Sequence, residues 1–579
     1  MVQLTPAIWG EAMNRRIALG LAIAGLFLTS ATPVPASYGV LIRGGTIYDG
    51  SGSVPYVGDV AIEGDKIVFV GPHASGRATR TIDATGKAVS PGFINMLSWA
   101  NEDVIADPRG MSDTYQGVTL EVMGEGNSMG PWTPAMKRLE LKRQSDIRYP
   151  IKWTTLGEYL GWLTRKGITP NVASFVGATT VRVHELGEKD VDPTPAQLDR
   201  MRALVRKAMK EGAVGVGSSM IYAPATYAET PELVALAHEA ARCGGMYISH
   251  IRDEGPKLLE AIDELVTISR ESGAPAEIYH YKQAGKANWG KIDAAIARVN
   301  DARASGLRIT ADMYTYAASS TGFDAAFPSW MQDGGLEAWI ERLKDPALRA
   351  KAIAEMKGPK GTENAKLIVD DPDKVLLVGF KTAKLKPLTG KTLGQVARER
   401  GKPPAEVAAD LIVADGTRIQ LVYFSMNPDN VKREIALPWM SFGSDAGSQA
   451  PEGVFLKSST HPRAYGNVAR LLGHHVRDQH ATTLQDAIHR LSWLPASNLG
   501  IKGRGALLPG YYADVVVFDP ATIRDNATYE KPQQLASGVD DVFINGVQVL
   551  KDGKHTGAKP GRFVRGPGWT GWPGGGACR

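Results

Sequence analysis

The sequence predicts an α/β protein, namely a (β/α)8 TIM barrel with a small β-sandwich domain formed from both chain ends. Short β-rich runs broken by glycines fill residues 39–82 and return between residues 514 and 550. Between these ends, apolar strand-like runs alternate with helical stretches of about 10–15 residues, the pattern of parallel β/α units. The chain has 579 residues, which leaves room for one large domain with attachments or for several smaller domains.

The terminal β-rich runs share one pattern. Stretches of β-branched and aromatic residues lie between the turn-forming pairs Gly44-Gly45 and Gly64-Asp65, as expected of short hairpin strands. The same pattern returns at residues 514–518 and 542–550. We therefore expect one small domain that is assembled from both ends.

The central segment supplies the alternation that a barrel requires. Strands are expected at residues 118–123, 214–217, 246–250, 277–280 and 308–312. Helices are expected at residues 196–211, 231–243, 258–272 and 291–305. In a barrel of this kind the residue that closes each strand lies at the catalytic face.

The amino terminus has the features of a secretory signal. Arg15 and Arg16 precede an apolar run over residues 17–28, and small residues lead to a cleavage point after Ala36. The run is shorter than the roughly 20 residues that span a bilayer. We expect an exported protein, periplasmic or secreted, without stable membrane insertion after cleavage; an uncleaved membrane anchor is the alternative.

These patterns divide the chain into five parts. The expected ranges are a signal peptide at 1–36, the first part of the β-sandwich at 37–90, the barrel at 91–500 with an insertion near 324–374, the second part of the β-sandwich at 501–565 and a flexible tail at 566–579. The chain has 2 cysteines, Cys243 and Cys578, and the second lies beside the carboxyl terminus. We therefore expect no structural disulfide, and a packing role for Cys243.

Composition excludes several classes of protein. The hydrophobic fraction is 43%, so a disordered chain is excluded, and the cysteine count excludes a disulfide scaffold. The formal net charge is +5, and no dense run of Lys and Arg occurs. Nucleic acid is therefore not an expected partner.

Polar side chains collect where the expected strands end: Glu125, His250, His280, Lys282, Tyr314 and Asp445. Two histidines with carboxylates are suitable ligands for a divalent metal, because imidazole and carboxylate both offer lone pairs to zinc. These residues are far apart in sequence, and the barrel alone would make them neighbours. A metal site is one interpretation, and ordinary structural histidines are the other.

An ordered series of segments carries a resemblance to known proteins. These are residues 90–94 (Ser-Pro-Gly-Phe-Ile), 116–119 (Gln-Gly-Val-Thr), 218–224, 249–255, 314–322, 443–445, 461–466 and 509–519. Through these segments, over nearly the whole mature length, the chain resembles the amidohydrolase superfamily and, within it, the N-acyl-D-amino-acid deacylases (D-aminoacylases). The resemblance implies the same barrel and terminal β-sandwich.

The resemblance also implies roles for individual residues. His250 and His280 match the ligands of the tightly held metal, and Asp445 matches the carboxylate that moves protons between the attacking water and the leaving amine. Lys282, Tyr314 and Ser320 match the binding site for the substrate carboxylate. Arg252 and His461, from two further matching segments, complete the residues expected at the substrate.

The sequence departs from the family at three places. The superfamily carries His-x-His after Pro-Gly-Phe-Ile, whereas this chain has Leu97 and Trp99 there. We therefore expect one metal ion, zinc, instead of two, and a packing role for Trp99. In the deacylases a cysteine in the segment that matches residues 124–131 is a metal ligand. If the alignment deletes one residue, Glu125 occupies the position of that cysteine, and without the deletion Gly126 does. We favour Glu125 as the third ligand. The third place is residues 177–180 (Gly-Ala-Thr-Thr), where relatives often have a histidine after the glycine; this departure affects substrate selection.

The expected function is metal-dependent hydrolysis of an N-acyl-D-amino acid to a carboxylate and a free amino acid. The substrate is a small molecule, and the oligomeric state is not assigned. Hydrolysis of a cyclic amide or of an unusual dipeptide fits the same residues. A metal-free, non-catalytic relative is the alternative from a different class of protein.

Overall fold

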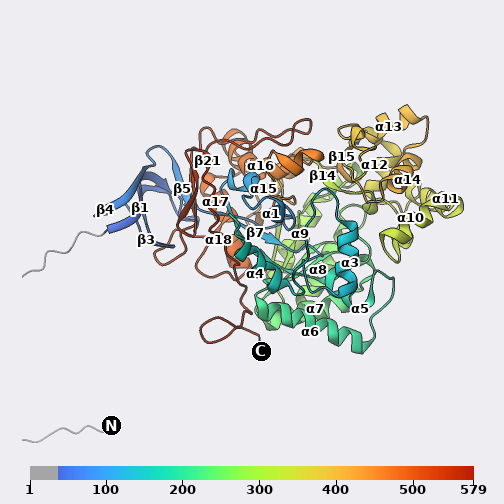
Figure 1. Cartoon of the computed structure of the whole chain (residues 1–579), viewed down its shortest axis with the longest axis horizontal. Coiled ribbons are helices and arrows are strands. Elements are labelled where there is room, and N and C mark those ends of the chain that lie inside the picture. Colours follow the sequence, from blue (N-terminus) through green and yellow to red (C-terminus); the bar gives the residue numbers. More distant parts are fainter. Residues whose placement is uncertain (1–36, 579) are drawn as a thin grey trace, which may run out of the picture.

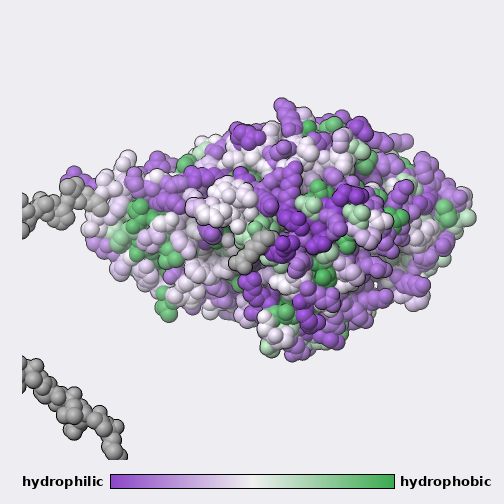
Figure 2. Space-filling view, turned by 90° about the horizontal axis from the view of Figure 1, so that it is seen from below, coloured by the Kyte–Doolittle hydropathy of each residue, from purple (hydrophilic) through white to green (hydrophobic). Residues whose placement is uncertain are grey.

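The computed structural model describes residues 37–578. The expected signal peptide, residues 1–36, lies outside the described residues. Among residues 37–578, no helix has both the length and the apolar character needed to cross a membrane. On the face shown in Figure 2, apolar patches are small and are separated by hydrophilic surface.

The two ends of the chain form one β-rich domain, as the sequence predicts (Figure 1). Its nine strands are hydrogen-bonded in the order β21-β20-β19-β18-β5-β1-β2-β3, and β4 pairs with β1. They are β1 (Ser37–Ile47), β2 (Tyr56–Glu63), β3 (Lys66–Gly71), β4 (Arg77–Asp83), β5 (Ala88–Pro91), β18 (Val515–Phe518), β19 (Val539–Ile544), β20 (Val547–Lys551) and β21 (Lys554–His555). The join between the two ends is the antiparallel pair β5–β18.

The middle of the chain forms the predicted parallel barrel. Its strands are β6 (Phe93–Asn95), β7 (Val118–Met123), β8 (Asn171–Ser174) with β9 (Val176–Gly177), β10 (Gly215–Ser219), β11 (Met246–His250), β12 (Ala276–Ile278), β13 (Ile309–Met313) and β17 (Met440–Phe442). β8 and β9 are separated by a single residue, and they join the two parallel sheets. The ring closes where the Met96 amide donates to the Phe442 carbonyl at 3.1 Å.

Helices cover the outside of the barrel (Figure 1). They include α4 (Leu156–Lys166), α5 (Ala178–Leu186), α6 (Pro195–Glu211), α7 (Thr230–Arg242), α8 (Leu258–Ser272), α9 (Ile292–Ala304), α15 (Pro428–Ile435) and α17 (Leu484–Leu491). α6 shows how local sequence fixes an element. Thr194 and Gln197 form a capping box, Pro195 opens the helix and Gly212 ends it at φ +114°.

Short helices complete the barrel region: α1 (Asp103–Ala106), α2 (Met111–Thr114), α3 (Pro134–Arg143), α16 (Arg463–Arg470) and α18 (Trp493–Asn498). α1 and α3 follow the first two barrel strands on the side where those strands end. They lie beside the candidate site described below, and α3 begins at Pro134 behind the capping hydroxyl of Thr133.

The predicted insertion is larger than residues 324–374. It forms a unit with its own antiparallel sheet in the order β14-β16-β15, seen at the right of Figure 1. Its elements are β14 (Ser319–Gly322), α10 (Leu336–Lys344), α11 (Pro346–Lys357), α12 (Glu363–Asp370), β15 (Val375–Gly379), α13 (Leu393–Arg400), α14 (Pro404–Asp415) and β16 (Gln420–Tyr423). A separate hydrophobic core runs from Phe323 to Tyr423, so the unit ends about where β16 returns to the barrel.

The carboxyl-terminal segment differs from the expected flexible tail. Over residues 566–578 it packs against the end of α6, where the Gly566 amide donates to Gly212 at 2.9 Å and the Thr570 amide donates to Lys210 at 3.1 Å. Its Cys578 is bonded to Cys243, which is buried after α7. The prediction of no structural disulfide was therefore wrong, because only the tertiary fold brings together two cysteines separated by 335 residues.

The disulfide gives a direct chemical test. Protein produced under oxidising conditions and denatured without reductant should contain no free thiol, since both cysteines of the chain are paired. Reduction should then release two thiols per chain, measured with a thiol reagent. Two free thiols before reduction would contradict the pairing.

Candidate functional site

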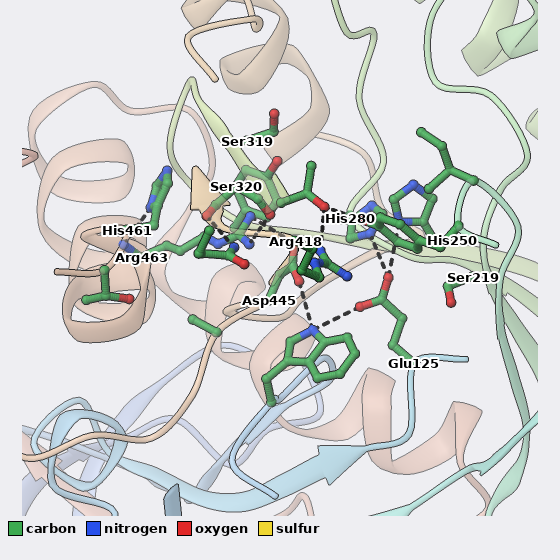
Figure 3. A pocket seen from close by; sticks show the side chains of 18 of the residues that line it. Glu125, Ser219, His250, His280, Ser319, Ser320, Arg418, Asp445, His461 and Arg463 are labelled. Atoms are coloured by element: carbon green, nitrogen blue, oxygen red, sulfur yellow. Dashed lines mark hydrogen bonds and ion pairs between the residues drawn. The ribbon is translucent and has the colours of Figure 1, made fainter. Parts of the chain in front are cut away.

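A cavity of about 470 Å³ lies at the carboxyl ends of the barrel strands. The inserted unit forms one of its walls through β14, α12 and β16. Eight of the nine residues predicted for the site line it: Glu125, His250, His280, Lys282, Tyr314, Ser320, Asp445 and His461. Figure 3 shows Glu125, His250 and His280 at one side, His461 and Arg463 at the other, and Asp445 between them.

Glu125, His250 and His280 form a compact buried group. Glu125 Oε1 lies 3.1 Å from His250 Nδ1 and 3.2 Å from His280 Nε2. The three side chains offer ligand atoms that all lie within 4.8 Å of one another. Among residues 37–578 this is the one group of three or more such side chains found. Two imidazoles and a carboxylate are a frequent ligand set for zinc in hydrolases.

The backbone explains why Glu125 reaches this position. It follows β7 between Gly124 and Gly126, which have φ values of +106° and +65°. A Cβ on Gly126 would lie 1.9 Å from the Ser219 hydroxyl, so only glycine fits. The tight turn brings the Glu125 carboxylate, rather than Gly126, beside the two histidines.

Contacts to the backbone amide and to Nδ1 fix the position of His280. Its backbone, at φ +36°, donates through the amide to Asp312 Oδ1 at 2.8 Å. Its Nδ1 lies 3.0 Å from Glu254 Oε1 and 2.7 Å from Lys282 Nζ. If Nδ1–H donates to Glu254, the lone pair of Nε2 faces the cavity, as a metal ligand requires. A carboxylate behind a histidine is the usual support for such a ligand.

The electrostatics of the group favour a cation at its centre. Burial and Lys282 both oppose a charged imidazole, yet the carboxylates of Glu254 and Glu125 raise the pKa of His280 to about 10. Burial would raise the pKa of Glu125, but the two histidines hold it well below its usual range. A divalent ion between Glu125, His250 and His280 would supply the positive charge that the histidines otherwise supply to Glu125, so the residues present fit a metal ion.

Asp445 lies beside Glu125, His250 and His280, which are called the metal group from here on. The Asp445 backbone adopts a strained conformation. Its φ is +49°, and its amide donates to the Leu97 carbonyl at 2.9 Å. Oδ2 is 2.8 Å from Arg463 Nη1, and Oδ1 accepts from Trp99 Nε1 at 3.1 Å. Burial raises the pKa of Asp445, and Arg463 opposes the shift. Strained residues held by their surroundings are typical of active sites.

Trp99 has a different role from the predicted one. Its Nε1 donates to Asp445 and also to Glu125 Oε2 at 3.0 Å. The residue is 37% exposed, so it does not fill a buried volume. The packing role was therefore wrong: Trp99 connects the metal group to Asp445 and contributes to the cavity wall.

Two cations line the cavity around Tyr314: Lys282 beside His280, and Arg463 beside Asp445. Lys282 and Arg463 are both buried, and Arg463 lies over the Tyr314 ring at 4.4 Å. Arg463 Nε is buried with no hydrogen-bond partner, so it can donate to a bound anion. The Tyr314 hydroxyl points to Met426 Sδ at 3.4 Å, and the Ser320 hydroxyl donates to the Leu421 carbonyl at 2.7 Å. These two residues shape the wall, while the cations supply the charge.

Two predicted substrate residues have other contacts. Arg252 lies outside the residues that line the cavity, because its guanidinium pairs with Glu264 at 2.8 Å and donates to the carbonyls of Thr226 and Ala228. Its assignment to the substrate was wrong. His461 lines the cavity, but Nε2 lies 3.0 Å from the Ala318 carbonyl and Nδ1 accepts from the Arg463 amide at 2.9 Å. It orients Arg463.

Sequence reasoning missed Arg463, Glu254 and the hydrogen-bonding role of Trp99. Arg463 lies two residues after His461 in a segment already matched to the family. Glu254 follows His250 by four residues in another matched segment. Both segments therefore carried the signal, but only the structure shows which of their side chains enter the cavity.

Comparison with known proteins gives a consistent result. Residues 80–554 match the model of the amidohydrolase family. The chain is 31% identical over 540 residues to a D-aminoacylase from Alcaligenes xylosoxydans xylosoxydans, covering 91% of this chain and 97% of that protein. It is also 31% identical over 536 residues to an N-acyl-D-aspartate deacylase from the same organism, covering 92% and 95%.

Solved structures agree with the sequence comparison. An N-acyl-D-glutamate deacylase from Bordetella bronchiseptica, complexed with zinc and a phosphonate inhibitor, superposes with a TM-score of 0.75 at 28% identity and covers 92% of this chain and 100% of that chain. A D-aminoacylase structure gives 0.73 at 30% identity, covering 91% and 100%. Together with the barrel and the buried Glu-His-His group, these matches show that the chain belongs to the amidohydrolase family, in its D-aminoacylase branch.

Proposed function

We propose that this chain is a zinc-dependent hydrolase that removes the acyl group from N-acyl-D-amino acids. The observation that carries this proposal is one cavity that combines three kinds of group. These are a buried Glu-His-His group, a carboxylate positioned for proton transfer and a pair of buried cations. The relatives named above act on D-configured substrates, and they support the stereochemical part of the proposal.

Glu125, His250 and His280 would hold one divalent ion. When bound, such an ion lowers the pKa of a water molecule and polarises the amide carbonyl. Asp445 takes the proton of the attacking water on its carboxylate and passes it to the amide nitrogen as the C–N bond breaks. The indole N–H of Trp99 and the guanidinium of Arg463 hold that carboxylate in place.

Lys282 and Arg463 bind the carboxylate of the amino-acid half. Guanidinium and ammonium groups are strong partners for a carboxylate when all are buried. Lys282 is already oriented by Glu254 and by the His280 carbonyl, 2.7 Å away. This orientation places the amide nitrogen on the Asp445 side of the cavity and the acyl group on the other side.

Replacing Arg463 with methionine is expected to raise KM for an N-acetyl-D-amino acid by about 10- to 100-fold, the value of a hydrogen bond to a charged group. The control is the matching N-acetyl-D-amino-acid amide, which lacks the carboxylate. Its kcat/KM should fall much less, since the variant removes a carboxylate partner. An equal loss on both compounds would show that Arg463 acts through Asp445 alone.

A chiral panel of N-acyl amino acids tests the proposed function. D-Configured members should be hydrolysed, their L-counterparts should be hydrolysed much more slowly, and cyclic amides should not react. Hydrolysis is measured as release of the free amino acid. Equal inactivity on every linear N-acyl amino acid, with zinc present, would exclude deacylation.

We also propose that the protein works outside the cytoplasm, periplasmic or secreted, and is not inserted stably in the membrane. The amino-terminal signal pattern and the Cys243–Cys578 disulfide support this, because disulfides persist in oxidising compartments. Fractionation of the source cells should recover a chain that begins after Ala36. Recovery of the full-length chain in the membrane fraction would contradict the proposal.

A further inference from the structure

A second cavity of about 480 Å³ adjoins the first. The two cavities share six wall residues: Trp99, Asp103, Asn127, Ser219, Tyr222 and Ala223. We call the second cavity the acyl lobe. With the carboxylate of the amino-acid half bound by Lys282 and Arg463, as proposed above, the acyl group would extend past Trp99 into this lobe. The inference below therefore rests on the proposed function.

The acyl lobe is acidic. Glu102, Asp103 and Glu140 line it, and no salt bridge within residues 37–578 includes any of the three. Glu188 also lines the lobe, and it is paired with Arg143 at 2.7 Å. Arg143 is the arginine that lines the lobe, and its second partner is Glu337 at 2.6 Å. Three carboxyl groups of the lobe therefore have no cationic partner.

Asp103 is the member best placed to bind a ligand. Its side chain lines both cavities, and the residue is 7% exposed. The Gln449 side chain, a neutral donor, hydrogen-bonds to this carboxylate, while Oδ2 is buried without a hydrogen-bond partner. Glu102 accepts from the Tyr149 hydroxyl at 2.8 Å, and Glu140 accepts from the same hydroxyl at 3.2 Å. One neutral donor thus serves two carboxyl groups, which leaves acceptor positions free for a cation.

The raised pKa values of the buried Glu102 and Asp103 carboxyl groups are consistent with a missing positive charge. Desolvation, with the neighbouring Glu140, raises the pKa of Glu102 to about 7. Desolvation, with Glu102, raises the pKa of Asp103 to about 7. Buried carboxylates are normally paired with a cation or a metal ion. A bound cation would relieve both the burial and the mutual repulsion of these groups.

The remaining walls of the lobe suit a short organic cation. They are aromatic and apolar side chains: Trp99, Trp132, Met129, Met136, Leu139 and Val183. Indole faces attract ammonium groups, and methionine and leucine side chains accommodate a carbon chain. The hydroxyl of Thr179 is buried without a hydrogen-bond partner, and Thr179 also lines the lobe.

The charged groups of the two cavities differ in their partners. Lys282 and Arg463 line the first cavity, where Glu254 and Asp445 are their carboxylate partners, whereas Asp103 and Glu102 line the acyl lobe without a cationic partner among the described residues. We propose that the acyl group of the substrate carries an ammonium, so that the preferred substrate is an aminoacyl-D-amino acid. Its ammonium binds Asp103 and Glu102, and its carboxylate binds Lys282 and Arg463.

The reaction needs no further reactant. Water supplies the oxygen that bonds to the acyl carbon, and the C–N bond breaks. One proton of the water goes to the departing amine by way of Asp445. The products are two free amino acids when the acyl group is an aminoacyl group.

The test compares glycyl-D-leucine with propanoyl-D-leucine, which has a methyl group where the glycyl compound has its ammonium. Wild-type kcat/KM should be at least about tenfold higher for the glycyl compound, the value of a charge-assisted hydrogen bond. The Asp103→Asn variant should lower that ratio by about tenfold, and Glu102→Gln should lower it in the same direction. Glu399→Gln, on the exposed surface of α13, should leave both rates unchanged.

A ratio of one or less in the wild type, with propanoyl-D-leucine still hydrolysed, would overturn this inference and leave the proposed deacylase function intact. If neither compound is hydrolysed, the proposed function fails for these substrates. The affinities of the two compounds, measured by calorimetry, then decide: tighter binding of the glycyl compound would support the acidic lobe, and equal binding would overturn it. The same calorimetry applies if the variants fail to fold, because it uses wild-type protein.

Discussion

Replacing Asp445 with asparagine should lower kcat by about 1,000-fold, within the range that general acid–base catalysis contributes. The asparagine side chain has the same shape, but it cannot accept a proton from water and return it to the amide nitrogen. The Trp99 indole, which donates to Oδ1 in the wild type, can still donate to the amide oxygen. Steady-state kinetics on an N-acyl-D-amino acid measures the effect.

Metal content is the control for this variant. Asp445 is not among the three clustered metal-binding side chains, so the variant should retain the same amount of zinc as the wild type. A variant that keeps more than a tenth of the wild-type rate would show that another group moves the proton. Loss of zinc together with activity would instead assign Asp445 to the metal site.

Replacing Glu125 with alanine should weaken zinc binding by more than about 100-fold, since even an outer partner of a metal ligand contributes about 10- to 100-fold. Glu125 supplies the carboxylate between His250 and His280. Its removal also leaves the Trp99 indole with Asp445 as its single partner. Competition with a chelator of known affinity measures the change.

The matched control is Ser320→Ala, which alters the same cavity at a residue that contacts neither histidine. Its hydroxyl donates to the Leu421 carbonyl within the inserted unit. Zinc affinity should therefore stay near the wild-type value. If Glu125→Ala binds zinc as tightly as Ser320→Ala does, Glu125 is a loop carboxylate and the site consists of two histidines.

The sequence could predict the barrel and the core of the site because both follow from local patterns. His250 ends an apolar strand and His280 follows the next one, and parallel strands of a barrel end on the same face. Glu125 required a choice between two alignments. The alignment with Glu125 is favoured because it gives the metal a third protein ligand and keeps Ser128 in register, and the backbone angles of Gly124 and Gly126 show how the chain turns to place Glu125 there.

Other features depend on contacts that the local sequence does not contain. Arg252 stands in a matched segment, yet Glu264 and two carbonyl groups draw it away from the cavity. The Cys243–Cys578 pair depends on how the carboxyl-terminal segment crosses α6. The acyl lobe joins residues of α1, α3 and α5 that share no motif.

Trp99 is another residue whose role the local sequence does not indicate. At the sequence level it was a lost metal ligand, because tryptophan offers no lone pair to zinc. In the structure its N–H reaches the carboxylates of Glu125 and Asp445 together. The substitution thus replaces a ligand with a donor that orients two acidic groups, which the loss of the motif alone does not indicate.

The most direct test of the account is the activity of metal-free protein as zinc is added in measured amounts. Residues 37–578 contain one three-ligand group, so hydrolysis of an N-acyl-D-amino acid should rise linearly and reach its maximum at one zinc per chain. Activity that needs two zinc ions per chain would contradict the single site. No activity at any amount of zinc, on any linear N-acyl-D-amino acid, would contradict the enzyme itself.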